Sequence, residues 1–377
     1  MSEMSGQDKF GIDIDFLPVG ENSRSGDAIC LRWGWNLKDE SGVTRKQFVM
    51  VIDGGYADNG ADVVRHIKKY YGTSNINVLV NTHPHADHVN GLEEIVDSCS
   101  VNYLVMHQPW NHTGLKASFR DGRVTSKSIR QSLKDGLEKA FSVASKAEKN
   151  GTKLCECFVR SKWMDLCGID VFVLNPTKTY YDGLLPAFNA TPTAVESEGG
   201  RRVEFSAKLV KDKECPLTDD GETSAENNSG IVLALKLPFV IGGLILLTGD
   251  AGIPALENAV VEANNLGLDL QNDLKFFQVP HHGSIQNLGP TILNKIFGIA
   301  GEARKRRKIA YVSVCKEHDN EHPSKHVINA LQERGVSCFM TDGQIIHKSY
   351  GDVPERKGWE ALTEIQHYDY VEQVYVP

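Results

Sequence analysis

The residues best suited to chemistry form one short run, His83-Pro84-His85-Ala86-Asp87-His88, directly after the apolar residues 76–80. Imidazole nitrogens and carboxylate oxygens are ligands for zinc, and also for manganese or iron. In an extended loop His83 and His85 point the same way, and a turn into a following helix would carry Asp87 and His88 toward a second centre. The run therefore predicts a metal site rather than a set of surface histidines.

Three further polar pieces also follow apolar stretches. Asp250 ends LILLTGD, His281-His282 ends FFQVPHH, and Asp53 ends VMVID. Ligands at strand ends can converge, because a rigid sheet positions the loops that carry them. Alone, Asp250 would more often be a turn residue, but beside the other pieces its two oxygens could bridge two metal ions. We therefore expect these residues to meet at one edge of a sheet.

The elements that must position these residues alternate between strands and helices. Strands are expected over 10–19, 28–35, 47–53, 76–80, 101–106, 155–160, 169–174, 231–248 as a hairpin, 274–279, 308–314 and a final pair within 336–348. Helices are expected near 62–71, 92–96, 128–144, 254–265, 290–298 and 324–334. This mixture implies an α/β fold in which helices pack outside the sheets. Residues 176–226 show no regular pattern, and we expect a long functional or mobile loop there.

Composition and charge limit the possible classes of protein. The 377 residues carry 41 Lys and Arg against 49 Asp and Glu, a net charge of −8, so the whole molecule is no general binder of polyanions. Eight scattered cysteines and a polar N-terminus indicate free thiols and a cytoplasmic location. Residues 231–249 are apolar, but Lys236 and Pro238 interrupt them, which favours a hairpin over a membrane span.

Together the motifs resemble the metallo-β-lactamase superfamily, and within it most closely the hydrolase domain of bacterial competence (ComEC-type) DNA-uptake proteins. The matching segments are His83–His88, Thr248-Gly249-Asp250, Pro280-His281-His282-Gly283-Ser284, Asp53-Gly54-Gly55, Asn227-Asn228-Ser229, His322-Pro323 and Thr341-Asp342-Gly343. The resemblance implies an αββα sandwich of two mixed sheets flanked by helices, with metals at one end. The hydrolase domain would span residues 10–350, with insertions near 107–127 and 176–226, followed by a C-terminal extension over 351–377.

The resemblance also implies a ligand set for two divalent metal ions, zinc or manganese. The first ion would take His83 and His85, the second would take Asp87, His88 and His282, and both would share Asp250. Asp53 and Asn228 would support the ligands from behind. We favour His282 over His281 as the ligand, and His281 would then face the substrate.

One departure from the superfamily pattern affects the first ion. Many members carry a further histidine before the shared aspartate, whereas residues 224–231 offer only Asn227, Asn228 and Ser229. The first site could therefore be weak, hydrated or completed by a distant group. His107 and His112 are candidates for that group, although a loop or substrate-facing position is expected for each.

The expected reaction is hydrolysis by a metal-activated hydroxide, because two cations about 3.5–4 Å apart lower the pKa of a shared water. Asp87 would take part in catalysis, and His281, or alternatively His322, would protonate the leaving oxygen. We expect a phosphodiesterase or nuclease whose partner is a nucleic acid or nucleotide, without a membrane. The alternatives are an acyl hydrolase for lactones, thioesters or amides at the same site, and a non-catalytic effector subunit with a degenerate metal site.

Other features could contact a nucleic acid. The basic run Arg304-Lys305-Arg306-Arg307-Lys308 could meet phosphates, although a solvated helix end is the simpler interpretation. Trp33, Trp35 and Trp110 could stack on bases, although packing is expected for each. The sequence identifies no protein partner.

Overall fold

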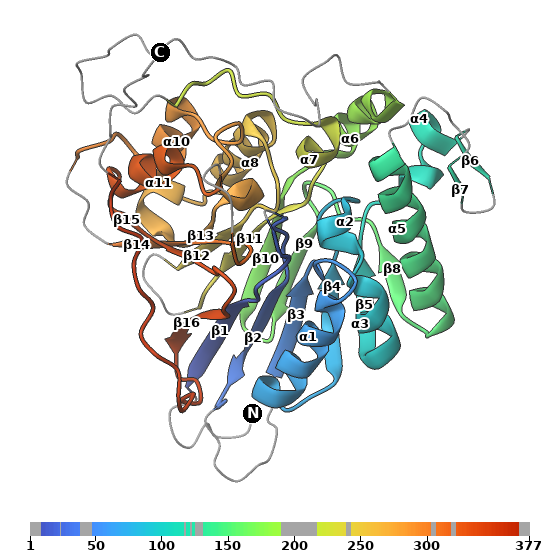
Figure 1. The fold of residues 1–377 in the computed structure, drawn as a ribbon, viewed down its shortest axis with the longest axis horizontal. Coiled ribbons are helices and arrows are strands. Elements are labelled where there is room, and N and C mark those ends of the chain that lie inside the picture. Colours follow the sequence, from blue (N-terminus) through green and yellow to red (C-terminus); the bar gives the residue numbers. More distant parts are fainter. Residues whose placement is uncertain are drawn as a thin grey trace.

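The computed structural model describes residues 9–22, 24–37, 47–116, 118–120, 123–124, 131–189, 217–238, 243–302, 307–317 and 322–368. Two seven-stranded mixed sheets lie face to face, and helices cover the outer surface of each (Figure 1). This arrangement confirms the predicted αββα sandwich.

The first sheet has the strand order β16-β1-β2-β3-β4-β5-β8. Its strands are β1 (Phe10–Phe16), β2 (Ile29–Trp35), β3 (Gln47–Ile52), β4 (Asn75–Val80), β5 (Ser100–Val105), β8 (Lys153–Cys155) and β16 (Ile346–Gly351). Alternation along β1 turns Ile12 and Ile14 toward the second sheet. The opposite face packs against α1 (Asn59–His66) and its continuation η1 (Ile67–Tyr71), α3 (Leu92–Ser98) and α5 (Gln131–Lys149).

The second sheet has the strand order β15-β14-β13-β12-β11-β10-β9. Its strands are β9 (Lys162–Leu166), β10 (Ile169–Asn175), β11 (Val232–Lys236), β12 (Leu244–Leu247), β13 (Leu274–Gln278), β14 (Lys308–Val312) and β15 (Val336–Met340). Its outer face packs mainly against α8 (Ile253–Asn265), α10 (Pro290–Phe297) and α11 (Lys325–Gln332), with α9 (Leu270–Asp273) nearby. Phe276 and Tyr311 meet Phe16 of the first sheet in the layer between the sheets.

Short elements lie outside the two sheets. They are α2 (Ala86–Val89), η2 (Pro109–Asn111), α4 (Thr113–Lys116), β6 (Phe119–Arg120), β7 (Arg123–Val124), α6 (Lys178–Leu184), η3 (Leu185–Asn189), α7 (Ala225–Asn228) and η4 (Pro280–Gly283). Helix α6 and η3 join α4 and α5 around a small separate core that includes Leu137 and Tyr181. The prediction of a patternless loop over 176–226 is therefore wrong for 178–189, while 190–216 lie outside the described residues.

The structure tests two further predictions about the strands. The hairpin predicted over 231–248 is confirmed, because β11 and β12 pair antiparallel. The last two strands do not pair with each other as expected: β15 joins β14, whereas β16 crosses to the first sheet and pairs with β1.

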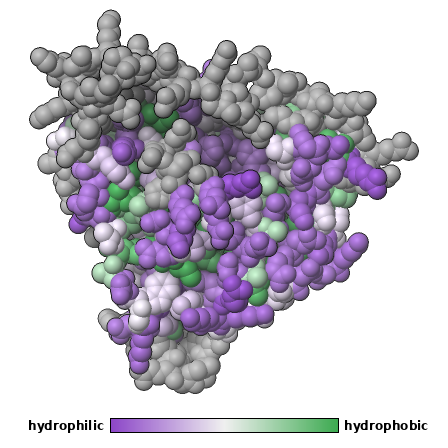
Figure 2. Space-filling model, in the orientation of Figure 1, coloured by the Kyte–Doolittle hydropathy of each residue, from purple (hydrophilic) through white to green (hydrophobic). Residues whose placement is uncertain are grey.

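None of the described helices is long and apolar enough to cross a membrane. The face seen in Figure 2 is mainly hydrophilic, with hydrophobic residues scattered in small groups.

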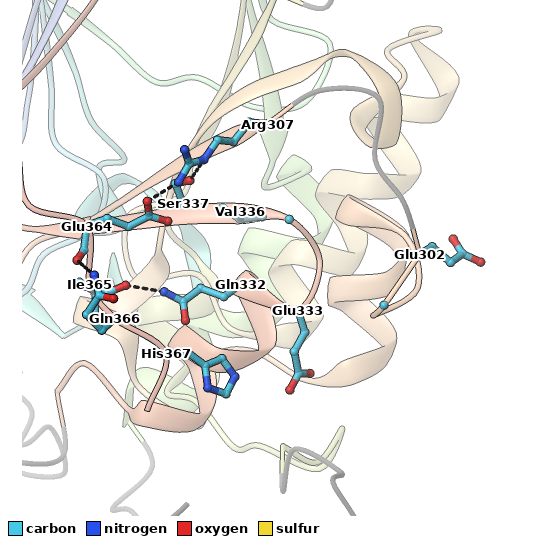
Figure 3. Close-up of a pocket in the computed structure, with 12 residues that line it drawn as sticks. Glu302, Arg307, Gln332, Glu333, Val336, Ser337, Glu364, Ile365, Gln366 and His367 are labelled. Carbon is cyan, nitrogen blue, oxygen red and sulfur yellow. Dashed lines mark hydrogen bonds and ion pairs between the residues drawn. The ribbon is translucent and has the colours of Figure 1, made fainter. Parts of the chain in front are cut away.

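The described part of the C-terminal extension packs on the sandwich. The guanidinium of Arg356 donates to both oxygens of the buried Asp15, at 2.5 and 2.8 Å. Further on, the N–H of Ile365 donates to the carbonyl of Cys338 on β15, and Gln332 of α11 donates to the carbonyl of Ile365 (Figure 3). The segment thus links the edges of both sheets. Residues 369–377 lie outside the described residues.

Replacement of Arg356 by alanine should lower the free energy of unfolding by about 3–5 kcal/mol, because Asp15 would remain buried without its guanidinium partner. Urea unfolding monitored by tryptophan fluorescence measures the change. Lys357→Ala is the matched control, since Lys357 is exposed. Equal stability of the two variants would show that the extension contributes little to the fold.

Candidate metal centre

The candidate site lies at one end of the sandwich, where parallel strands of both sheets stop. Strands β3 and β4 run parallel and lead into Asp53 and the loop 83–88. Strands β12 and β13 run parallel and lead into Asp250 and His281-His282. The carboxyl ends of parallel strands meet at one edge of a sheet. These two edges face each other, so four loops converge on one site.

Asp250 belongs to two groups of potential ligands. One group consists of Asp87, His88, Asp250 and His282, and the other of His83, His85 and Asp250. Within each group, one ligand atom from every residue lies within 4.8 Å of the others. The structure therefore brings together the residues predicted as ligands, in the predicted division with a shared aspartate.

Three buried polar atoms of this cluster have no hydrogen-bond partner among the described residues: His88 Nε2, His282 Nε2 and Asp250 Oδ1. His88 Nε2 lies 3.3 Å from Asp250 Oδ2, and His282 Nε2 lies 3.5 Å from Asp87 Oδ2. These distances are long for a hydrogen bond. They match the roughly 3.4 Å between two tetrahedral ligands that each lie about 2.0–2.2 Å from one zinc ion. The donor set and its spacing thus fit a divalent cation.

The Nδ1 atoms of three histidines face acceptors on the side of the ring away from Asp87 and Asp250. His83 Nδ1 lies 3.0 Å from Thr82 Oγ1, His88 Nδ1 lies 2.7 Å from Asp53 Oδ2, and His282 Nδ1 lies 3.0 Å from the carbonyl of Ser313. Each contact places a proton on Nδ1 and directs the other ring nitrogen, Nε2, toward Asp87 or Asp250. Metal-binding histidines are commonly oriented in this way.

Asp53 supports the ligand loop from behind. It accepts hydrogen bonds from the N–H and hydroxyl of Thr82, at 2.8 and 2.6 Å, and from the side chain of Asn81 at 3.2 Å. Its backbone has a φ of 57°, which is uncommon for a residue other than glycine. The contacts to Thr82 and His88 hold this strained position in place.

Burial and nearby charges perturb the acids and bases of the site. Burial alone would lower the pKa of His282, but the carboxylates of Asp87, Asp250 and Asp27 raise it to about 9. Burial would also lower the pKa of His88, but the neighbouring carboxylates outweigh this effect and hold the pKa well above its ordinary value. In the metal-free protein, protons on these two imidazoles therefore supply the positive charge that the buried carboxylates require.

The first group of ligands is electrically different. Burial, together with the charges of His88 and His85, holds the pKa of His83 well below its ordinary value. Burial also lowers the pKa of His85, partly opposed by the charges of Asp87 and Glu226. Glu226 is 4% exposed. It was not predicted as a site residue from the sequence, which drew attention only to Asn227, Asn228 and Ser229. Both imidazoles are thus neutral and available as ligands.

The segment that replaces the further superfamily histidine forms α7. Asn228 donates to the hydroxyl of Thr223 at 2.8 Å and to the carbonyl of Ser224, so its amide group braces the α7 turn. Asn227 is nearer the site, with Nδ2 3.5 Å from His281 Nδ1. The side-chain oxygens of both asparagines are buried without a hydrogen-bond partner among the described residues.

His281 and His322 flank the site. His281 Nε2 lies 3.6 Å from Asp250 Oδ2, and its side chain is 34% exposed. The ring centroids of His281 and His322 are 6.5 Å apart. The N–H of Ser324 donates to the carbonyl of Gly283, which joins the turn that carries His322 to the loop that carries His281.

His107 and His112 do not complete the first group of ligands. His107 Nε2 lies 2.8 Å from the carbonyl of Cys157. His112 is held between Glu156 and Asp182, with nitrogen-to-oxygen distances of 3.0 and 2.5 Å. Both histidines thus hold loops together, which agrees with the loop position expected for them.

Two polar residues behind the site were not predicted from the sequence. Asp27 is buried, accepts a hydrogen bond from Gln278 Nε2 at 2.9 Å, and lies 3.9 Å from His88 Nδ1. Gln278 Oε1 accepts from the N–H groups of Thr248 and Gly249. This chain of contacts connects the loop after β1 with the loop that carries Asp250. Neither residue belongs to a motif, so no local signal distinguished them.

The fold and site define an αββα sandwich with a candidate metal centre at one end, and part of the chain is similar to a known family. Residues 43–139 match the family model of the metallo-β-lactamase superfamily. The matched segment contains β3, β4, the His83–His88 loop and β5, so the similarity to that family model includes part of the candidate site. No curated protein matches the sequence significantly.

Several solved structures are similar to the chain. A Cronobacter sakazakii metallo-β-lactamase HARLDQ motif mutant has a TM-score of 0.30 and 11% identity, over 60% of this chain and 56% of that one. Unliganded yeast PDE1 has a TM-score of 0.47 and 11% identity, over 90% of this chain and 98% of that one. A long form RNase Z from yeast has a TM-score of 0.36 and 10% identity, over 96% of this chain and 50% of that one.

Metal affinity should rise with pH. A proton must leave His282 before its Nε2 can bind a metal, and the pKa of this group is raised to about 9 in the metal-free protein. Each displaced proton changes the apparent affinity by about tenfold per pH unit below that pKa. Competition with a chelator at pH 6, 7 and 8 measures the slope, which should be smaller in His282→Gln. An affinity independent of pH would contradict this assignment.

Asp53→Asn should weaken metal binding by about 10–100-fold while the fold is retained. Asparagine tolerates the left-handed backbone of this position, so the substitution mainly removes the charge that faces His88. Metal content after dialysis against limiting chelator measures the effect. Asp58→Asn, at an exposed position beside α1, is the control and should keep the metal content of the unmodified protein.

Proposed function

We propose that the chain is a metal-dependent phosphodiesterase or nuclease that acts on a nucleic acid or a nucleotide. The observation that carries this proposal is the position of Asp250. Its Oδ2 lies 3.6 Å from His83 Nε2, 3.3 Å from His88 Nε2 and 3.6 Å from His281 Nε2. Asp250 is therefore placed where both groups of ligands could share it, and His281 lies near the same carboxylate oxygen.

The two groups of ligands would hold two divalent cations, zinc or manganese. Such ions, when bound, lower the pKa of a water and neutralise oxygens of the group under attack. This chemistry suits phosphodiesters, where charge stabilisation and alignment supply most of the catalysis. The motif resemblance to the hydrolase domain of DNA-uptake proteins adds support by analogy.

The other catalytic and positioning roles belong to individual side chains of the site. Asp87 is 22% exposed at its side chain, so it is the ligand carboxylate that solvent reaches, and it orients the attacking water. His281 is the accessible imidazole beside Asp250, and it protonates the leaving oxygen. His322, next to His281, is the alternative donor. Asp53 holds His88 in the orientation that directs Nε2 into the site.

The described members of the basic run lie at the opposite end of β14 from the candidate site. Arg307 and Lys308 lie at the start of β14, whereas Ser313, which contacts His282, follows its end. Arg307 pairs with Glu364 and also contacts Ser337 (Figure 3). Lys308 donates to the carbonyl of Gln271 at 2.7 Å. Arg304, Lys305 and Arg306 lie outside the described residues.

The tryptophans likewise have structural contacts. Trp33 is fully buried, stacks on Phe48 at a centroid distance of 4.5 Å, and donates to the carbonyl of Leu166. Trp110 is 8% exposed and packs edge-on against Phe141. Trp35 packs edge-on against Phe10. The packing expected from the sequence is therefore present at all three positions.

Metal-stripped protein reloaded with Mn²⁺ or Zn²⁺ should cleave phosphodiesters, and His85→Ala should lower the rate by more than about 100-fold. The substrates are labelled single- and double-stranded DNA, RNA, cyclic nucleotides and bis-p-nitrophenyl phosphate. His367→Ala, on the exposed end of the C-terminal segment, is the control and should retain full activity.

The same panel separates the alternatives. Hydrolysis of p-nitrophenyl esters, lactones or thioesters that requires His85, without phosphodiester cleavage, would assign the site to acyl transfer. Absence of any hydrolysis together with less than one metal per chain would indicate an effector subunit.

A further inference from the structure

Asn287 connects the two loops of the second sheet that form the site. It is fully buried and lies in the segment between η4 and α10. Its Nδ2 donates to the carbonyls of Asp250 and Ala251, at 2.9 and 3.2 Å. Its Oδ1 lies 2.9 Å from Nδ1 of His281. One amide group therefore contacts both the shared aspartate's backbone and the accessible histidine.

These contacts determine the orientation of the Asn287 amide. Carbonyl oxygens accept hydrogen bonds and do not donate them, so the group that faces Asp250 and Ala251 must be the NH₂. The oxygen is then left to accept from His281. This contact, at 2.9 Å, is shorter than the 3.5 Å between the same Nδ1 and Nδ2 of Asn227, so it decides the tautomer: Nδ1 of His281 carries a proton, and the lone pair of the neutral imidazole lies on Nε2.

The opposite nitrogen of His281 faces the reaction site. His281 Nε2 lies 3.6 Å from Asp250 Oδ2. His281 thus shares the arrangement of His83, His88 and His282, in which Nδ1 is held by an acceptor and Nε2 faces a carboxylate. It differs in exposure, since the side chain of His281 is 34% exposed and those of the other three are 0–7% exposed.

The backbone of His281 adopts an unfavourable conformation that contacts with other residues must stabilise. His281 has φ 47° and His282 has φ 57°, so two successive residues other than glycine adopt left-handed conformations. Such conformations are unfavourable and persist only where contacts with surrounding residues hold them. The buried amide of Asn287 is one such determinant, because it fixes the His281 ring relative to Asp250.

We propose that Asn287 is a positioning residue that keeps His281 in the Nδ1–H tautomer, so that Nε2 is the nitrogen that delivers a proton to the leaving oxygen. The catalytic part of this proposal rests on the proposed function. As the phosphorus–oxygen bond breaks, the leaving oxygen takes the proton from Nε2 of the imidazolium, and the ring regains a proton from solvent. The Nδ1 proton stays on His281 throughout, hydrogen-bonded to Oδ1 of Asn287.

The first test reads the tautomer directly and needs no substrate. Long-range ¹H–¹⁵N spectra of ¹⁵N-histidine-labelled, metal-free protein should show His281, assigned by its loss in His281→Ala, with the proton on Nδ1. In Asn287→Ala the proton should move in part or wholly to Nε2. An unchanged Nδ1–H tautomer in Asn287→Ala would overturn the proposal, whether or not the protein is a phosphodiesterase.

The second test compares substrates with different leaving groups. General acids contribute about 10²–10⁴-fold where the leaving group needs a proton. Asn287→Ala should therefore lose about 10–100-fold in kcat on a dinucleotide, whose alkoxide needs a proton, and less than about threefold on bis-p-nitrophenyl phosphate. Metal content per chain should be unchanged. Equal losses on both substrates, or a parallel loss of metal, would show a merely structural role and overturn the proposal.

Two further variants separate positioning from folding. Asn287→Asp keeps an acceptor for His281 but loses the donors to Asp250 and Ala251, so it should regain most dinucleotide activity despite lower thermal stability. Asn329→Ala removes another fully buried amide, which contacts Tyr368 on the C-terminal segment. It should lower stability without a difference between the two substrates. A wild type that cleaves neither substrate would refute the proposed function, and the tautomer measurement would still decide the role of Asn287.

Discussion

The burial of Asp250 is the constraint on which the site depends. A carboxylate taken out of water costs several kcal/mol unless positive charge and hydrogen bonds replace its solvent. The charges of His88 and His281 outweigh the effect of burial and hold the pKa of Asp250 well below its ordinary value. His83 and His88 come from a loop of the first sheet, and His281 comes from a loop of the second. The packing of the two sheets and the charge state of the site therefore depend on each other.

The architecture explains how these loops are brought together. Parallel strands in each sheet end at the same edge, and the stacked sheets place the two edges opposite each other. Gln278 then bridges the sheets, because it donates to Asp27 from the first half of the chain and accepts from the backbone before Asp250. Backbone strain at Asp53 and His281 is confined to positions where such contacts hold the side chain.

Much of this could be predicted from sequence, because the main pieces adjoin apolar strands. The His83–His88 run, Asp250 and His281-His282 each stand next to a strong strand pattern, and the structure gathers them. Asp27 and Asn287 stand in loops with no periodicity, so their importance is visible only through contacts across the fold. The pairing of β16 with β1 joins Gly11 to Gly351, a separation that local patterns do not encode.

A comparison within the molecule shows why the candidate centre calls for cations. At the other buried acidic cluster, Asp13 and Asp15 on β1 contact Arg32 and Arg356 in addition to two histidines, so permanent guanidinium charges help to balance the carboxylates. At the candidate centre the charged groups in contact with Asp87 and Asp250, among the described residues, are histidines. Imidazoles can balance these carboxylates only by carrying protons, and they release those protons to become metal ligands. Permanent guanidinium charges would close the site to metal, whereas titratable imidazoles leave it able to exchange protons for divalent ions.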